Sequence, residues 1–243
     1  MVQSSQPKKR VKRANLALTE DKPGEDLMSL ADRAYRIIES RIVRLKYPPG
    51  SALSEYRLSL EIGISRTPVR EAFRRLAAEQ IIEILPRKGA FVTDVKLDQY
   101  LHILDLRQEL ESFIAVRAAR KASPEQRERM KRLALDLRAG VGDPEQEVFV
   151  LTDRSYKDLI VEAARNPFVG SIVAPMQALS RRFWYYHRSQ WENDEPVVAI
   201  RHHLAVMDAV ACGDEAAAQV AVAKLFEYLE SFAMRVLKSQ FKI

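Results

Sequence analysis

The sequence has few of the residues that build disulfides, cysteine-based metal sites or membrane spans. It contains one cysteine, Cys212, and four histidines among 243 residues. A single cysteine excludes an internal disulfide and a cysteine-based zinc site. No apolar run approaches the roughly 18 residues that a membrane span needs, because even the longest uncharged run, 166–180, includes Ser, Pro and Gln. No apolar segment follows the basic N-terminus, as one would in a secretory signal. We therefore expect a cytoplasmic protein that does not enter a membrane.

The motifs of several common enzyme classes are also missing. The sequence has no His-Glu-x-x-His pair, no glycine-rich phosphate loop and no cysteine with an evident base. A histidine could still supply a general base, and turnover of a bound metabolite would reveal one. The four histidines are His102, His187, His202 and His203. We expect a protein without enzyme activity.

Charge is unevenly distributed along the chain. Residues 1–98 carry 19 Lys and Arg against 13 Asp and Glu, whereas residues 99–243 carry 20 of each kind. The whole net charge of +6 therefore lies in the first two-fifths of the sequence. This asymmetry indicates a module that binds a polyanion joined to a neutral module, although a basic solvated face would give the same balance.

The first 27 residues have the composition of a flexible basic arm. Residues 1–27 are polar, show no hydrophobic periodicity and contain the basic run Lys8–Arg13. Such a run could contact DNA phosphates, act as a nuclear-targeting signal or belong to a disordered tail.

Residues 28–95 show the pattern of three helices and a β-hairpin. Ser29 can begin a first helix, which consecutive prolines then end. A second, short helix is expected from the N-cap Ser54 to Gly63, a residue suited to the left-handed end of a helix. Because another helix follows this tight turn at once, the pattern predicts a helix-turn-helix at about residues 55–74.

The third helix carries the arginines that we expect to meet DNA. Ser65 or Thr67 can cap it, and its apolar side chains recur at helical spacing along one face. The other face carries Arg66, Arg70 and Arg74, each four residues apart. The N-terminal residues of such a helix reach base edges in the major groove, where arginine can pair with guanine. Alternatively, these arginines form a solvated face that pairs with local acids.

A β-hairpin with a basic tip follows. Residues 81–85 and 90–93 have the short, β-branched pattern of strands, and the segment between them has the composition of a turn. The tip residues Arg87, Lys88 and Gly89 can enter the DNA groove beside the recognition helix. Glycine at this position lets the two backbones approach closely.

The pattern of residues 97–240 is that of a helical bundle. Prolines stand at the expected helix starts, and the short connections require successive helices to be antiparallel neighbours. The expected helices span about 97–122, 124–139, 144–165, 167–190, 196–212 and 214–240. The predicted fold is therefore mostly α: an N-terminal winged helix-turn-helix, made of three helices and a β-hairpin, and a C-terminal antiparallel all-helical bundle.

Several runs in the N-terminal part form a recognisable family pattern. They are Pro48–Gly50, Leu53–Glu55, Ile62–Ala72, Arg75–Leu76 and Lys88–Val92. Together they resemble the winged helix-turn-helix of the GntR family of transcription regulators. The resemblance implies that Ser65, Arg66, Thr67, Arg70 and the wing around Gly89 contact DNA. The family usually has arginine where Tyr56 stands, which leaves the adjacent Arg57 as a candidate on the second helix.

The bundle carries a second, weaker pattern. The runs Asp105–Glu111, Asn166–Pro167 and His203–Asp214 resemble the FCD ligand domain of the FadR-type subfamily. The resemblance implies an all-helical effector-binding and dimerisation domain over residues 97–240. It further implies a homodimer on an inverted-repeat operator, with a small carboxylate, sugar acid or related metabolite as effector. An architectural DNA-binding protein that binds no effector and uses the bundle only to dimerise is the alternative.

The metal site that many members of this subfamily hold is altered here. The resemblance implies a divalent metal on one Asp and three His, and Asp153 and His203 match two of these ligands. Lys157 and Leu225 stand where the other histidines are expected. Since two ligands are too few for a tight site of this kind, we expect no metal cofactor, and a metal-dependent member of the family is the alternative.

We hypothesise that the Lys157 ammonium replaces the charge of the metal. It would bind the carboxylate or phosphate of the effector together with His203 and Arg107, beside Asp153. Two alternatives remain open. Asp153 and Lys157 could form an ordinary i, i+4 ion pair, or Lys157 and Leu225 could fill the pocket.

The segment Arg181–Arg188 is the densest aromatic and basic cluster in the chain. It could line the effector pocket or the dimer surface. The more common role of such a stretch is to provide core residues and a solvated face.

Overall fold

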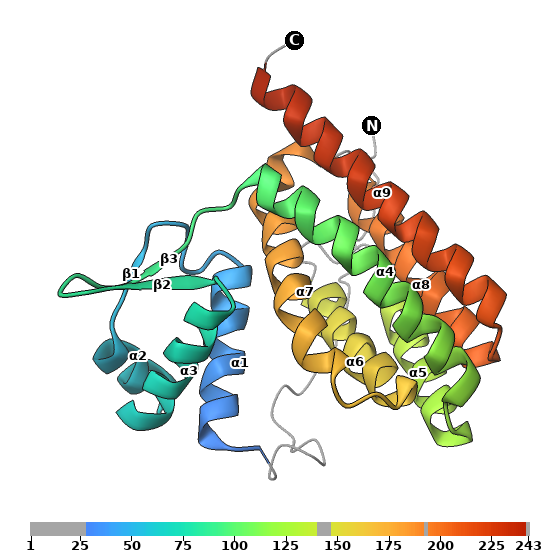
Figure 1. The fold of residues 1–243 in the computed structure, drawn as a ribbon, viewed down its shortest axis with the longest axis horizontal. Helices are drawn as coiled ribbons and strands as arrows, with labels where there is room; N and C mark the ends of the chain where they lie inside the picture. The colour runs from blue at the N-terminus through green and yellow to red at the C-terminus, as the bar shows by residue number, and fades with distance from the viewer. Residues whose placement is uncertain (1–27, 140–146, 192–193, 242–243) are drawn as a thin grey trace, which may run out of the picture.

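The computed structural model describes residues 28–139, 147–191 and 194–241. It contains a small N-terminal unit of helices and strands beside a larger bundle of helices (Figure 1). The predicted fold, a winged helix-turn-helix joined to a helical bundle, is confirmed. The expected basic arm, residues 1–27, lies outside the described residues. No helix in the described part of the chain is long and apolar enough to cross a membrane.

Local sequence signals set the ends of the N-terminal helices. The helices are α1 (Leu30–Val43), α2 (Glu55–Ile62) and α3 (Arg66–Ala78). The side chains of Ser29 and Ser54 accept hydrogen bonds from the backbone N–H groups of Asp32 and Arg57, as N-caps do. Gly63 ends α2 with φ of 67°, a left-handed conformation that glycine adopts without strain. The turn that places α3 against α2 therefore follows directly from the sequence.

The first helix is shorter than the sequence predicted. It was expected to continue up to the prolines, but α1 ends at Val43. The Lys46 N–H donates to the Arg41 carbonyl at 2.8 Å, and Leu45 takes a positive φ of 58°. These features close the helix before the prolines are reached.

The hairpin is part of a three-stranded antiparallel sheet. Its strands are β2 (Ile82–Leu85) and β3 (Gly89–Val92), and β1 (Ala52–Leu53) pairs with the other edge of β3. The sequence did not predict β1, because a strand of two residues leaves no periodic pattern and forms only by pairing with a partner. The β2–β3 tip projects away from the bundle (Figure 1).

The bundle is built around one long central helix. Its helices are α4 (Leu97–Lys121), α5 (Pro124–Ala139), α6 (Glu147–Ala164), α7 (Val169–Tyr186), α8 (Glu195–Cys212) and α9 (Glu215–Phe241). Helix α4 packs against α6, α7, α8 and α9. The helix expected over 167–190 ends at Tyr186, and a separate 3₁₀ turn follows at Arg188–Gln190.

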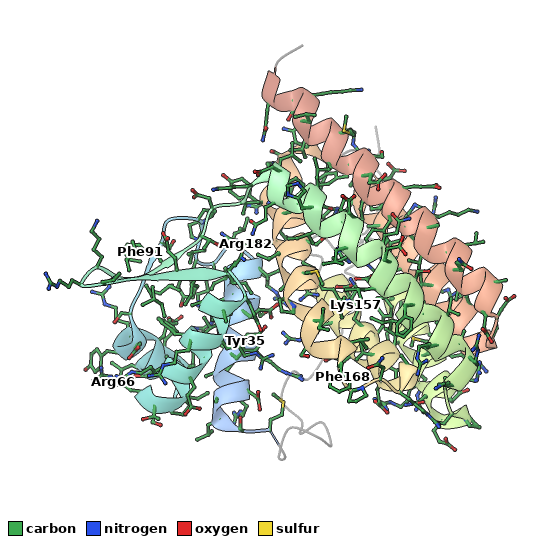
Figure 2. The ribbon with its side chains drawn as sticks, viewed as in Figure 1. Tyr35, Arg66, Phe91, Lys157, Phe168 and Arg182 are labelled. Carbon is green, nitrogen blue, oxygen red and sulfur yellow. The ribbon has the colours of Figure 1, made fainter. Side chains whose placement is uncertain are left out.

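Helix α7 makes the most extensive contact between the bundle and the N-terminal unit. It packs against α1, which forms the side of the N-terminal unit nearest the bundle (Figure 1). Arg182 of α7 donates hydrogen bonds to the Thr93 hydroxyl at 2.9 Å and to the Thr93 carbonyl, directly after β3. Figure 2 shows Arg182 between α7 and the sheet. The two units are therefore joined by polar contacts as well as by the connection between β3 and α4.

Candidate DNA-binding surface and effector pocket

The start of α3 is exposed to solvent on the N-terminal unit. The α3 residues Val69, Ala72 and Phe73 are buried on its inner face and fix the orientation of the helix. Arg66 and Thr67 are exposed on the opposite side, and Arg66 lies at the end of the unit remote from the bundle (Figure 2). This placement leaves the end of α3 free to enter a DNA groove.

The remaining predicted residues of this surface are also exposed. Ser65 precedes α3 and makes no capping hydrogen bond with its side chain. Arg57 and Arg74 are exposed on α2 and α3. Arg70 is half-exposed and donates its Nε–H to Glu55 of α2 at 3.1 Å. The alternative of local ion pairing therefore holds for Arg70, which must exchange this carboxylate for DNA if it reads a base.

The wing presents its cations at a tight turn. Arg87 and Lys88 are exposed at the tip of the hairpin. Gly89 has φ of 98°, and a Cβ atom at this position would meet nothing within 4 Å. The space beside Gly89 is therefore open for close approach of another backbone, whereas its conformation disfavours any other residue.

The four predicted effector residues meet at one cavity inside the bundle. Arg107 of α4, Asp153 and Lys157 of α6 and His203 of α8 all line a cavity of about 40 Å³. Figure 2 shows Lys157 among the helices of the bundle, far from Arg66 at the DNA-binding edge. The apolar wall of the cavity includes Trp184 of α7. Residues far apart in the sequence therefore form a single site.

Asp153 is the hub of the charges in this cavity. Its carboxylate lies 3.3 Å from Lys157 Nζ, 3.0 Å from His203 Nε2 and 3.4 Å from Arg181 Nη1. Burial opposes its ionisation, but the charges of Lys157 and Arg181 and the hydrogen bond from His203 hold the pKa of Asp153 well below its usual range. Burial lowers the pKa of Lys157, although Asp153 and Glu111 oppose that shift. The Asp153 carboxylate thus lies close to nitrogen donors of three side chains.

Arg107 supplies a donor that no described residue accepts. Its side chain is 2% exposed and donates to Glu111 at 2.7 Å through Nη2 and at 2.9 Å through Nε. Gln177 donates to the same Glu111 oxygen at 3.0 Å. The other terminal nitrogen of Arg107, Nη1, is buried without a hydrogen-bond partner among the described residues. A buried cationic donor without an acceptor is costly, and Arg107 lies at the cavity wall.

Comparison with known families identifies the two units. Residues 30–92 match the model of the bacterial regulatory proteins of the gntR family, and residues 102–228 match the FCD domain. The chain belongs to the FCD-containing branch of the GntR family. It is therefore a transcription regulator of FadR-type architecture, as the resemblance implied, and not an enzyme.

Named relatives agree with this assignment. The chain is 28% identical to the HTH-type transcriptional repressor RspR of Escherichia coli K12, over 72% of this chain and 76% of that protein. It is 26% identical to the galactonate operon transcriptional repressor of the same strain, over 80% of this chain and 92% of that protein. The solved structure of E. coli McbR/YncC shares the fold, with a TM-score of 0.74 and 19% identity over 88% of this chain and all of that one.

The residues at the usual metal position of this GntR branch do not fit a metal here. Lys157 places an ammonium group beside Asp153, and Leu225 is buried in the apolar core. His203 Nδ1 lies 3.0 Å from the Ala199 carbonyl, and its Nε2 faces the Asp153 carboxylate. Among the described residues, no group of three or more His, Cys, Asp or Glu could hold a metal ion. The available donors therefore already bind one another, and a cation would meet Lys157.

Sequence reasoning left the role of α7 in this GntR-family pocket open. The cluster at Arg181–Arg188 was expected to form core, pocket or dimer surface. Its central residues, from Arg182 to Tyr185, are buried, and Arg181, Trp184 and Tyr185 also line the cavity. Density of aromatic and basic residues was the available signal, but only the fold shows which of them turn inward.

Proposed function

We propose that this GntR-family chain is a homodimeric repressor whose affinity for operator DNA changes when a small carboxylate or sugar acid binds in the bundle. The proposal rests on the buried Nη1 donor of Arg107 at the cavity wall, for which the described residues offer no acceptor. A carboxylate would accept from Arg107 and approach the Lys157 ammonium, because hydrogen bonds between opposite charges are the strong ones. The galactonate repressor among the relatives supports an acid of this class.

We further propose that the anion binds without a metal. Lys157 occupies the position of a family ligand and supplies one positive charge within 3.3 Å of Asp153. His203 and Asp153 can then bind hydroxyl groups next to the carboxylate, since one donates and the other accepts. This arrangement suits a hydroxy acid or a sugar acid.

The small cavity indicates how ligand binding could act at a distance. A volume of about 40 Å³ holds only a few water molecules, since one needs roughly 10–15 Å³ by this measure. A metabolite must therefore displace side chains or helices around the cavity when it binds. A ligand changes DNA affinity only by favouring one conformation over another, and this requirement is met if the expanded bundle positions the DNA-binding unit differently.

The DNA-binding part of the proposal assigns a role to each exposed residue. Arg66, Thr67 and Arg70 would read base edges from the start of α3, with Arg74 and Arg57 beside them on phosphates. Ser65 and the wing residues Lys88 and Gly89 would contact the backbone and the neighbouring groove.

An apolar surface on the bundle supports the homodimer. Leu106 and Phe113 of α4 are 53% and 44% exposed, Ile172 of α7 is 51% exposed, and Phe168, which precedes α7, is 74% exposed. Leu106 shares a cleft wall with Met176 of α7, which places the two helices side by side. Exposed large apolar side chains on neighbouring helices are typical of an interaction surface. A two-fold pair formed here would present two α3 helices, so the operator should be an inverted repeat.

A thermal-shift panel tests the effector. The purified chain is heated with D-galactonate, D-gluconate, L-lactate or L-malate, each with and without EDTA. We expect one or more acids to raise the melting temperature regardless of EDTA. Arg107→Gln should weaken binding of that acid by about tenfold or more, because a hydrogen bond to a charged group is lost. The matched control is Arg129→Gln, which removes an exposed arginine on α5.

The other outcomes point to the alternatives. A shift that EDTA abolishes would indicate the metal-dependent member of the family. No shift with any acid would favour an architectural DNA-binding protein without effector, whose bundle serves dimerisation. The DNA-binding part of the proposal is tested by selecting operators from a random duplex library. Recovery of an asymmetric site without an inverted repeat would contradict the dimer.

A further inference from the structure

We infer that Arg181 is part of the effector site and that Glu39 of the DNA-binding domain holds it there, so that the two domains share one site. This inference rests on the proposed function. It adds a residue of the other domain to the pocket and thereby states how operator binding and effector binding are coupled.

The Arg181 guanidinium bridges the two domains. It projects from α7 and is 15% exposed. Its Nη2 donates to Glu39 of α1 at 3.0 Å, and its Nη1 donates to Asp153 of α6 at 3.4 Å. One planar cation thus connects a carboxylate in the pocket with a carboxylate in the DNA-binding domain.

Glu39 has an unusual environment for an acid on a packed helix. It is 2% exposed, and its carboxylate lies 2.6 Å from Arg154 and 3.0 Å from Arg181, both of which belong to the bundle. A buried carboxylate is retained only where cations compensate it. Glu39 therefore depends for its charge balance on the other domain, and α1 cannot leave the bundle without exposing or stranding this charge.

The same residues separate the cavity from the cleft between the domains. Lys157, Gln177 and Arg181 line both the internal cavity and a cleft of about 640 Å³ that is bounded on its other side by α1 and α3. The wall between the effector and the DNA-binding domain is therefore one layer of side chains. A ligand that pushes on this layer acts directly on the contact to α1.

An anion in the cavity competes with Glu39 for Arg181. Without ligand, Arg181 is shared by Glu39 and Asp153. A bound carboxylate adds a third acceptor on the pocket side, which draws the guanidinium inward and weakens its hold on α1. The neighbouring Arg182 fixes the same helix to Thr93 at the end of the wing, so movement of α7 reaches the DNA-binding domain at two points.

The coupling is reciprocal by thermodynamic necessity. A ligand that weakens the Glu39–Arg181 contact must itself bind more tightly when that contact is absent. Removal of the Glu39 charge is therefore expected to strengthen anion binding. A purely structural clamp between the domains would give no such gain, because it would lower stability without changing the pocket.

A double-mutant cycle on operator affinity tests the bridge without any ligand. The full-length chain is compared with Glu39→Gln, Asp153→Asn and the double variant, on an operator selected from a random duplex library. Since both carboxylates share Arg181, we expect their effects on operator Kd to be non-additive by about fivefold or more. Effects that multiply within about twofold would overturn the inference. Circular dichroism checks folding, and Arg181→Lys replaces Asp153→Asn in the cycle if the latter does not fold.

The second measurement uses D-galactonate as the anionic probe. We expect Glu39→Gln to bind it about fivefold or more tightly than the unchanged chain, and to lose most of the effect of the probe on operator Kd. The control is Glu215→Gln. It removes an exposed glutamate whose partner, Arg120, belongs to the same bundle. Unchanged probe affinity in Glu39→Gln would overturn the inference. If the unchanged chain does not bind the probe, D-galactonate is not the effector, and the ligand-free cycle still decides whether Arg181 couples the domains.

Discussion

The two functional regions of this regulator treat charge in opposite ways. On the proposed DNA-binding surface, Arg66 and Lys88 are exposed to solvent. In the bundle, Asp153, Lys157 and Arg107 are almost wholly buried and lie within a few ångström of opposite charges. The first region is adapted to a polyanion that arrives from solvent. In the proposed site, an anion could accept from Arg107 Nη1, but it would reach Lys157 and Arg181 only by rearranging pairs that already exist.

This difference predicts where substitutions disturb folding and where they disturb only function. An exposed cation is well hydrated in the free protein, so its removal changes the folded state little. A buried charge that loses its partner remains desolvated and uncompensated, which is strongly destabilising. The DNA surface should therefore tolerate mutation, whereas the pocket combines binding with structural stability.

The largest effect is expected for Asp153→Ala. This change leaves Lys157 and Arg181 buried without their shared carboxylate, and we expect a loss of ~3–5 kcal/mol in the free energy of unfolding. Urea denaturation followed by circular dichroism measures it.

The matched control for that change is Asp208→Ala. Asp208 also pairs with an arginine, Arg138, at 2.6 Å, but both side chains are about half exposed. Its loss should cost less than ~1 kcal/mol. Equal costs for the two substitutions would mean that the pocket is hydrated in solution and that the contrast between the two regions is wrong.

The same contrast explains what the sequence could reveal. The helix-turn-helix depends on neighbours within a few residues, such as the cap Ser54 and the left-handed Gly63, so its fold and its exposed arginines were predictable. The strand β1 left no signal, because its pairing with β3 is not local. The family resemblance brought Asp153 and His203 together correctly, since both occupy positions of a known ligand set.

The bridge between the domains could not be predicted in this way. Glu39 and Arg181 are separated by 142 positions in the sequence, and nothing in the local pattern of α1 distinguishes Glu39 from a solvated acid. Arg181 belonged to a noted cluster, yet its inward direction depends on the rotation of α7 within the bundle. Such residues acquire their role from packing between distant helices, which composition and periodicity do not report.

A smaller effect, confined to DNA binding, is expected for Arg66→Ala. Loss of a bidentate contact to guanine should cost ~1–3 kcal/mol in the preference for the operator over a single-base variant. Melting temperature should remain unchanged, since Arg66 is exposed. Fluorescence anisotropy with both duplexes measures the preference, and Arg132→Ala, an exposed arginine of the bundle, is the control. Equal weakening on both duplexes would show that Arg66 contacts phosphates and reads no base.

The smallest effect is expected for Lys88→Ala at the tip of the wing. A lysine that contacts one phosphate releases about one counterion, so the slope of log K against log salt should become less steep by about 0.9. Affinity should fall by a similar factor on the operator and on unrelated duplex, because the contact carries no sequence information. Anisotropy titrations at salt concentrations between roughly 50 and 200 mM measure the slope. An unchanged slope combined with lost sequence preference would mean that Lys88 reads a base. The exposed cations of this regulator would then not form one uniform class.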